Sequence, residues 1–156
     1  YDIWFDEGSM KLYVMEEGKT PADAENPDTP EPGQTYFIRG EAFGWDAGRE
    51  MTDAGTHAIL TGIDAADLKQ SFKLYNSAAD LWYGRGGGGT YIHPILVGEA
   101  VELYNNNNNS EGQSNVRLDE NAEAGTYDVW FFYPSGTGEG DTGTIYIVKT
   151  GETPAI

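Results

Sequence analysis

Alternating apolar and polar positions predict short strands along most of this chain. The clearest stretch runs over 125–131 and is followed by a loop of Gly, Ser and acidic residues and then by 144–148. β-branched and aromatic residues dominate both stretches, which is typical of half-buried strands. We therefore predict two strands facing each other across a long polar turn. Phe131 and Trp130 lie on opposite faces, so one face is expected in the core and the other covered or used for binding.

The first residues of the chain repeat this pattern. Residues 1–5 match 127–131 almost residue for residue, and 11–15 match 144–148. The segments that follow the two hairpins also agree, because both contain Gly-x-Thr-Pro-Ala. Internal repeats indicate repeated structural units. We interpret 1–15 as the closing hairpin of a preceding repeat or as a strand-donating segment, and the chain as one period of a longer array.

A change in composition follows the first hairpin. Residues 16–34 hold four prolines among acidic residues. Such a segment cannot build a core, and its prolines and like charges extend it. We predict an acidic, Pro-rich linker over 16–34 and a single β-module over 35–150.

Within 35–150 the hydrophobic pattern indicates strands and almost no helix. One helical turn is expected at 64–68, capped by Asp64, and no segment with helical periodicity reaches about ten residues. Short strands separated by turn residues predict an all-β fold, an antiparallel β-sandwich that is immunoglobulin-like or starch-binding-module-like, with an extra N-terminal β-hairpin. The further strands are expected at 35–40, 56–62, 70–75, 90–92, 100–104 and 115–118.

Charge and cysteine content exclude several functions. The net charge of −17 disfavours binding to nucleic acid and to anionic membrane surfaces. The absence of cysteine excludes disulfides, thiolate catalysis and Cys-ligated zinc. Richness in Gly, Asn, Tyr and Trp with few Lys and Arg resembles bacterial surface proteins. On this composition we expect an extracellular location. We expect no direct membrane insertion of this segment, because it has no apolar run near the roughly 20 residues that span a bilayer.

The strongest candidate binding residues are Trp82 and Tyr83. They are expected in a polar, Gly-rich loop, where both rings can be exposed. Sugars present C–H faces that stack on aromatic rings, and their hydroxyls need amide or cationic partners. Lys73, Arg85 and Asn107, which lies in a run of asparagines, are the candidates for those contacts. The structural alternative is that Trp82 plugs one end of the sandwich.

Trp45 is a second candidate within a predicted turn. It serves either as a further stacking platform or as a structural cap whose indole packs beneath the loop, and the pattern favours the cap. Residues 84–89 formally match the dinucleotide-binding fingerprint. With no helix to follow, that match has no physical basis, and we interpret this run as a flexible surround for the Trp82 loop.

No catalytic motif is present in the sequence. His57 and His93 lie far apart, and the carboxylates fall mostly in turns and in the linker. We therefore predict that the chain is not an enzyme and has no cofactor. Calcium at acidic turns such as 139–141 is the alternative for a metal.

The order of these segments resembles the repeated starch-binding modules of SusE and SusF, outer-membrane lipoproteins of glycan-foraging Gram-negative bacteria. The resemblance covers about 35–149. It implies tandem β-sandwich carbohydrate-binding modules at the cell surface, in which Trp82, alone or together with Tyr83, stacks on the sugar and Lys73 contacts hydroxyls. The resembling residues are Tyr36–Gly40, Gly44–Asp46, Phe72–Leu74, Trp82–Gly84, Asn115–Leu118 and Gly125–Val129.

These observations predict a non-catalytic carbohydrate-binding module of a bacterial surface glycan-capture protein. Its partners are expected to be a glucan-like polysaccharide or oligosaccharide and neighbouring copies of the same repeat. The alternative is a structural repeat of a surface or filament protein, assembled by inter-subunit strand or hairpin complementation.

Overall fold

A computed structural model describes residues 2–6, 11–15, 35–86, 91–105, 114–136 and 140–156. The predicted linker at 16–34, most of the glycine run and Asn107 lie outside these residues. The described elements, in chain order, are β1 (Asp2–Asp6), β2 (Lys11–Met15), β3 (Tyr36–Gly40), β4 (Gly44–Glu50), β5 (Thr52–Asp53), β6 (His57–Asp64), α2 (Ala65–Leu68), β7 (Phe72–Asn76), β8 (Leu81–Gly84), β9 (Ile92–Ile95), β10 (Val101–Asn105), β11 (Asn115–Leu118), β12 (Thr126–Phe132) and β13 (Thr142–Lys149).

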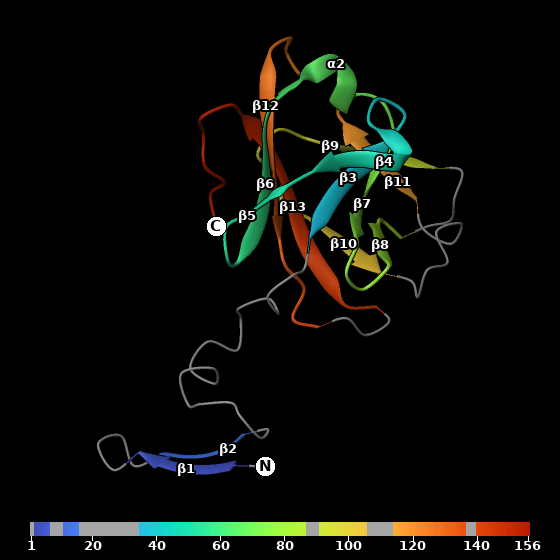
Figure 1. Cartoon of the computed structure of the whole chain (residues 1–156). Helices are drawn as coiled ribbons and strands as arrows, with labels where there is room; N and C mark the ends of the chain where they lie inside the picture. The colour runs from blue at the N-terminus through green and yellow to red at the C-terminus, as the bar shows by residue number, and fades with distance from the viewer. Residues whose placement is uncertain (1, 7–10, 16–34, 87–90, 106–113, 137–139) are drawn as a thin grey trace.

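The strands form a two-stranded sheet, β1-β2, and one large sheet. The large sheet follows the order β4-β3-β7-β8-β10-β13-β12-β6-β5, with β11 joined to β7 and β9 joined to β11. All of its pairs are antiparallel except β9 with β11. Met51 alone separates β4 from β5 along the chain. Because β4 pairs with β3 and β5 pairs with β6, the sheet is nearly closed on itself (Figure 1).

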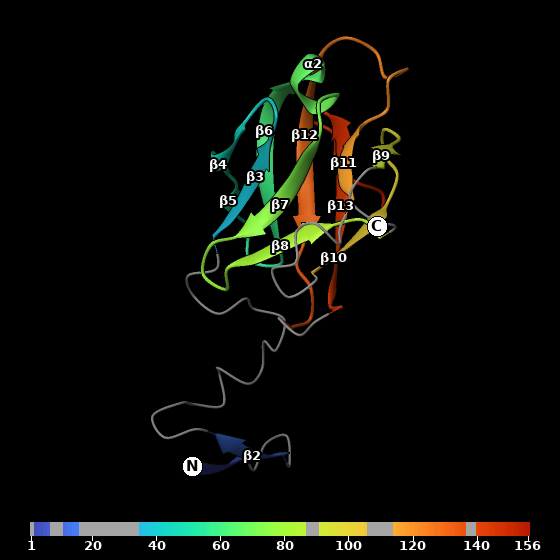
Figure 2. The same ribbon diagram turned by 90° about the vertical axis from the view of Figure 1, so that its right-hand side faces the viewer.

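Apolar side chains at alternate strand positions fill the interior of this sheet. β3, β7 and β8 lie in front of β6 and β12 in Figure 2, so the residues that these strands direct inward meet in one core. Tyr36, Tyr83 and Phe131 form its aromatic centre, with ring centroids 5.2 to 6.0 Å apart in tilted arrangements. Fully buried rings of this size contribute much of the hydrophobic stabilisation.

The prediction of an all-β fold is confirmed. α2 is the one helix in the described part of the chain, and it begins after Asp64 as predicted, although the Asp64 side chain makes no capping hydrogen bond. Strands β4, β5 and β8 were not predicted. The finer assignment to a sandwich of immunoglobulin or starch-binding-module type, and the division of the chain into units, stay predictions.

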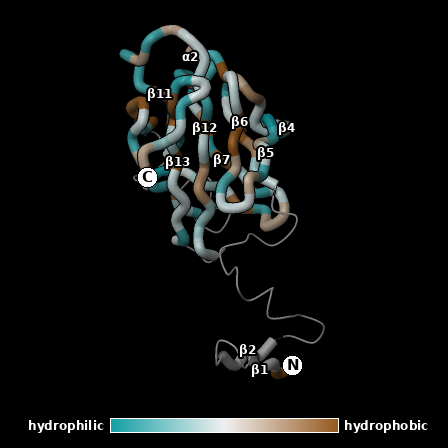
Figure 3. The backbone as a smooth tube through the Cα atoms, turned by 90° about the vertical axis from the view of Figure 1, so that its left-hand side faces the viewer, coloured by the Kyte–Doolittle hydropathy of each residue, from teal (hydrophilic) through white to brown (hydrophobic). Residues whose placement is uncertain are grey.

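The outer face of β12 and β13 is covered by the chain itself. The segment after β13 returns along this face (Figure 3), and Pro154 in it is buried, as are Tyr146 and Val148 of β13. Trp130 remains half-buried and stacks on His57 at 4.7 Å between ring centroids. Both faces of the hairpin are therefore used for packing.

Asp128 holds this covering segment in place. Its carboxylate is 4 % exposed and accepts hydrogen bonds from the backbone N–H of Gly62 at 2.8 Å, the hydroxyl of Thr150 at 3.0 Å and the N–H of Gly151 at 3.1 Å. A buried carboxylate requires such donors, because desolvation without them is costly. One side chain therefore links β6, β12 and the segment after β13.

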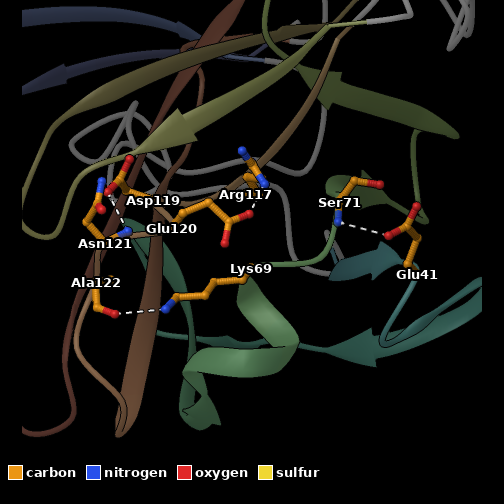
Figure 4. A network of polar contacts seen from close by, with 8 residues as sticks. All are labelled: Glu41, Lys69, Ser71, Arg117, Asp119, Glu120, Asn121 and Ala122. Carbon is orange, nitrogen blue, oxygen red and sulfur yellow. Dashed lines mark hydrogen bonds and ion pairs between the residues drawn. The ribbon is translucent and has the colours of Figure 1, made fainter.

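A second set of polar contacts fixes α2 (Figure 4). The Lys69 ammonium donates to the carbonyl of Ala122 at 2.8 Å, which ties the end of α2 to the turn before β12. Arg117 of β11 pairs with Glu120 in the same turn, and the backbone N–H of Ser71 donates to the Glu41 carboxylate. These contacts join the two sides of the sheet at the α2 end.

Replacing Asp128 tests its role in stability. We expect Asp128→Ala to lower the free energy of unfolding by about 3 kcal/mol, because it leaves buried donors without an acceptor. Urea denaturation followed by tryptophan fluorescence measures this loss. Asp64→Ala is the matched control, because the Asp64 side chain makes no capping hydrogen bond, and its expected effect is within about 0.5 kcal/mol. Equal losses in the two variants would contradict this role.

Candidate functional site

Trp82 and Tyr83 lie in strand β8, so their prediction as a loop pair was wrong. β8 pairs with β7, with Tyr75 opposite Trp82 and Leu74 opposite Tyr83. Adjacent residues of a strand point to opposite faces. Tyr83 is accordingly 0 % exposed in the core, and Trp82 lies half-buried on the outer face. Tyr83 is therefore a core residue, and Trp82 alone of the pair is presented outward.

Trp82 belongs to a cluster that we call the aromatic surface, defined by Phe37, Arg39, Trp45, Tyr75 and Trp82. The Trp82 ring lies 4.9 Å from Tyr75 and 6.4 Å from Trp45 between centroids, tilted by 49° and 44°. Strand pairing produces this cluster, because Phe37 of β3, Tyr75 of β7 and Trp82 of β8 lie side by side in one row across three strands. Such cross-strand neighbours contact each other on one face of a sheet.

Arg39 lies among these rings. Its guanidinium carbon is 3.8 Å from the ring centroid of Tyr75, 5.4 Å from that of Trp82 and 5.8 Å from that of Phe37. These distances are those of cation–π contacts, in which the cation is attracted to the ring face. The Nε atom of Arg39 is buried and has no hydrogen-bond partner. The stacking contacts therefore orient the Arg39 side chain.

Gly48 of β4 makes room for this arginine. A Cβ atom at Gly48 would lie 2.5 Å from Cγ of Arg39 and 2.8 Å from the carbonyl oxygen of Ile38, and its φ of +70° also favours glycine. Only a residue without a side chain allows β4 to approach β3 this closely. The local sequence of β4 therefore positions both Trp45 and Arg39.

The turn between β7 and β8 sets the position of Trp82. The Asn76 side-chain oxygen accepts hydrogen bonds from the N–H groups of Ala78 and Ala79, and Asp80 adopts a positive φ of 53°. Asn and Asp favour such turns because their side chains replace backbone partners. The Tyr75 hydroxyl donates to Asp80 at 2.9 Å, which fixes the ring next to Trp82.

Lys73 lies beside the aromatic surface on β7, directly opposite Arg39 in the strand register. Only 4 % of Lys73 is exposed, and burial lowers the pKa of its ammonium to about 8. The ammonium is therefore still mainly charged at neutral pH. Lys73 lies on β7, which pairs with the strand β8 that carries Trp82, and the predicted contact of Lys73 with sugar stays a prediction.

Trp45 is exposed, contrary to the expectation that it packs beneath a loop. It lies in β4 with 39 % of its surface exposed and contacts Trp82 rather than the core. The turn that was predicted to hold it ends two residues earlier, at Phe43, and it is Phe43 that packs against the core. The exposed position of Trp45 therefore matches the interpretation as a further platform rather than the favoured interpretation as a cap.

Arg85 and Asn107 are not part of the described aromatic surface. The backbone of Arg85 pairs with Ser114, and its guanidinium donates to the carbonyl of Glu102 at 3.0 Å. These contacts tie β8 to neighbouring segments and give Arg85 a structural function. Asn107 lies outside the described residues, so its predicted role stays a prediction.

Sequence reasoning missed Phe37, Arg39 and Tyr75. Each was recognised only as part of a predicted strand. Phe37 and Arg39 alternate with the core residue Ile38, and Tyr75 follows the core residue Leu74. This alternation was the available signal, because it directs all three side chains to the face opposite the core.

The two histidines lie apart in the fold and form no shared site. His57 stacks on Trp130, whereas His93 contacts Tyr91 at 4.5 Å between ring centroids and makes a 2.9 Å hydrogen bond with the carbonyl of Gly86. Burial lowers the pKa of His57. Among the described residues there is no group of three or more His, Cys, Asp or Glu placed to hold a metal ion, and no helix among them is long and apolar enough to cross a membrane. The predicted calcium turn includes Glu139, which lies outside the described residues.

Comparison with known proteins gives no assignment: no family model, no curated protein and no solved structure matches the chain. The resemblance to SusE and SusF modules therefore stays a prediction.

The environment of Lys73 gives a titration that can be measured. We expect the Lys73 side chain to titrate near pH 8, because burial disfavours its charged form. Lys149 is the contrast, since its hydrogen bond to Glu123 raises its pKa above the usual value. Heteronuclear NMR of the lysine side chains over pH 6–12 measures both. Between pH 8 and the ordinary lysine pKa, Lys73 keeps its proton in the unfolded chain but loses it in the folded chain. The buried ammonium therefore lowers the free energy of unfolding below pH 8, and this loss of stability disappears as the pH rises through that range. Titration of Lys73 at or above the ordinary lysine value would contradict its described burial.

Proposed function

We propose that the chain is a non-catalytic carbohydrate-binding module that uses the aromatic surface to hold a polysaccharide. The observation that carries this proposal is the contact between Trp45 and Trp82 on the outer face, beside two cationic side chains, Arg39 and Lys73. Large rings on a protein surface are normally covered or used for binding. Here they come from different strands and form one surface.

The chemistry of the aromatic surface suits sugar rings. Trp45 and Trp82 offer π faces to the C–H faces of a pyranose, and Arg39 offers guanidinium N–H groups to its hydroxyls. Arg39 is held by stacking on Tyr75, so little side-chain entropy is lost when it donates to a ligand. Both kinds of contact are available in one place without any change in the backbone.

The tilt between the two indoles favours a curved glycan. Trp45 and Trp82 are inclined by 44° to each other and so do not form one flat platform. A chain whose successive rings turn, such as an α-linked glucan, can follow such a pair, whereas a flat ribbon such as cellulose favours coplanar rings. This geometry supports a glucan-like ligand. The net charge of −17 supports a neutral ligand over a polyanion.

The proposed affinity of one module is weak, in the micromolar to millimolar range, with higher avidity from linked copies. We propose a location at the bacterial cell surface, of the outer-membrane type that the SusE and SusF resemblance implies. The repeated hairpin sequence supports neighbouring copies as partners. No enzymatic turnover is proposed, because the aromatic surface presents stacking rings and cations rather than a nucleophile with an adjacent base.

Affinity gel electrophoresis tests this function directly. We expect the wild-type chain to be retarded in gels that contain soluble starch or pullulan, and Trp82→Ala to abolish the retardation because it removes the central ring of the aromatic surface. Trp45→Ala is expected to weaken retardation. Circular dichroism should show that both variants keep the fold.

Tyr91→Ala and Tyr83→Phe are the controls. Tyr91 is an exposed aromatic residue outside the aromatic surface, and Tyr83 is a core residue. Both variants should be retarded like the wild type. Unchanged migration of Trp82→Ala beside a retarded wild type would refute the site. No retardation of the wild type in any gel of a panel that also contains dextran, xylan and β-1,3-glucan would refute the function.

A second candidate function is structural assembly through the N-terminal hairpin. β1 and β2 pair in the same register as β12 and β13: Ile3 lies opposite Val14 just as Val129 lies opposite Ile147. Val129 is 0 % exposed, whereas Ile3 is 72 % exposed. A two-stranded hairpin is marginally stable alone in water. We therefore propose, as the alternative, that β1–β2 completes the sheet of a neighbouring copy.

Deletion of 1–34 distinguishes the two roles of this hairpin. If it joins copies, we expect sedimentation velocity to show concentration-dependent assembly of the full chain and a monomer for the shortened chain. Ile3→Asp should weaken assembly in the same way, because it places a charge on a face that would be buried. A full chain that stays monomeric at every concentration, with an unchanged melting temperature after deletion, would exclude assembly through this hairpin.

A further inference from the structure

A cavity of about 460 Å³ opens where β3 begins and where β4 continues into β5. Its volume lies in the range of ordinary small-ligand sites. None of its lining residues belongs to the aromatic surface. The lining residues are Thr35, Tyr36, Glu50, Met51, Thr52, Asp53, Ala58 and Tyr133.

Two stacked tyrosines form the aromatic wall of this cavity. The rings of Tyr36 and Tyr133 lie 5.0 Å apart and nearly parallel, at 17°. Tyr36 is buried in the core, whereas Tyr133 is half-buried. A ring that rests on a rigid core residue is already held in position, so binding against it costs little conformational entropy.

Hydrogen bonds fix Tyr133 further. Its hydroxyl donates to Oδ1 of Asp53 at 2.7 Å, and its backbone N–H donates to the carbonyl of Thr56 at 3.2 Å. The same Oδ1 atom accepts the N–H of Gly55 at 2.8 Å. These two donors lower the pKa of Asp53, so it stays ionised well into the acidic range. Burial and the contact with Asp53 raise the pKa of Tyr133, so its hydroxyl keeps its proton.

The polar groups of the wall select among ligand classes. Glu50 and Asp53 carry negative charge, and none of the described residues that line the cavity is Lys or Arg, so an anionic ligand is disfavoured. Thr35 and Thr52 add hydroxyls, which makes an apolar ligand a poor match for most of the wall. A polyhydroxylated neutral ring matches both features. Its hydroxyls can donate to carboxylate oxygens in charge-assisted hydrogen bonds, and its C–H face can contact Tyr133.

We infer that this cavity is a second saccharide-binding site, separate from the aromatic surface, that takes a single neutral sugar ring against Tyr133 with Asp53 and Glu50 as hydrogen-bond acceptors. This site goes beyond the proposed function and does not depend on it. Phe37 of the aromatic surface lies opposite Glu50 of the cavity in the β3–β4 pair, so the two sites share one strand pair.

Single-ring probes separate the two sites, because one sugar ring can enter the cavity but cannot span both indoles. The full chain is titrated in ¹H–¹⁵N NMR with the methyl glycosides of glucose, galactose, mannose and xylose. We expect saturable shifts at the amides of Thr52, Asp53, Gly55 and Tyr133 with at least one probe, with a dissociation constant of about 1 mM or weaker.

Three variants complete the test. Tyr133→Ala should weaken binding at the cavity by about tenfold or more, because it removes the aromatic wall. Tyr133→Phe keeps the ring, loses the hydrogen bond to Asp53 and should weaken binding less, so it also reports if the alanine variant fails to fold. Trp82→Ala should leave the shifts at the cavity unchanged.

Each opposite outcome overturns the inference. Absence of saturable shifts at these amides with all four probes removes the site. Equal binding by folded Tyr133→Ala and the wild type removes the role of the Tyr133 ring. Binding by Tyr133→Phe that is as weak as that of Tyr133→Ala removes it as well, because the ring is kept in that variant. Loss of the shifts in Trp82→Ala would assign them to the aromatic surface, while loss of gel retardation alone in that variant concerns only the proposed function.

Discussion

The burial of Met51 is the constraint on which the aromatic surface and the cavity, the two proposed binding sites, depend. Met51 is 3 % exposed, and its N–H donates to the carbonyl of Tyr36 at 2.8 Å. Met51 lies in the middle of one continuous segment. The first part of this segment, β4, pairs with β3, and the second part, β5, pairs with β6. Because this segment closes the sheet, it brings Trp45 next to Trp82 on one side and Asp53 next to Tyr133 on the other. The pairing of β4 with β3 therefore positions Trp45, and the pairing of β5 with β6 positions Asp53.

Much of the fold could be predicted from the sequence because most strands alternate between one buried and one exposed face. β4 could not, since all its residues are exposed or half-buried and it has no apolar face to detect. β8 was missed for the opposite reason. In Leu81–Gly84, polar residues do not alternate with apolar ones, because the outward position is itself a tryptophan. Alternation of apolar and polar residues indicates which face of a strand is buried, not strand geometry itself. A strand whose two faces do not differ in polarity is therefore not predicted from this pattern.

The candidate site was predicted in part for a related reason. Trp82, Lys73 and Trp45 could be selected by residue type alone, since a tryptophan or a lysine near a turn is a recognisable candidate. Arg39 and Tyr75 become members only through the register of β3, β7 and β8, which pairs residues far apart in sequence. Tyr83 shows the converse error, because residue type suggested binding while strand geometry assigns it to the core. Long-range register is the information that a single sequence lacks.

The carboxylate of Asp128 also has a mechanical consequence. A force applied to the segment that follows Gly151 reaches Asp128 through Thr150 and Gly151, and then reaches β6 through Gly62. The load is therefore shared by β13, β12 and β6. It does not act only on the backbone hydrogen bonds between β13 and its neighbouring strands. The three hydrogen bonds on the Asp128 carboxylate add to the backbone bonds that hold the end of β13. Such a joint resists tension, as the proposed role of a surface module that holds a polymer in flowing liquid would require.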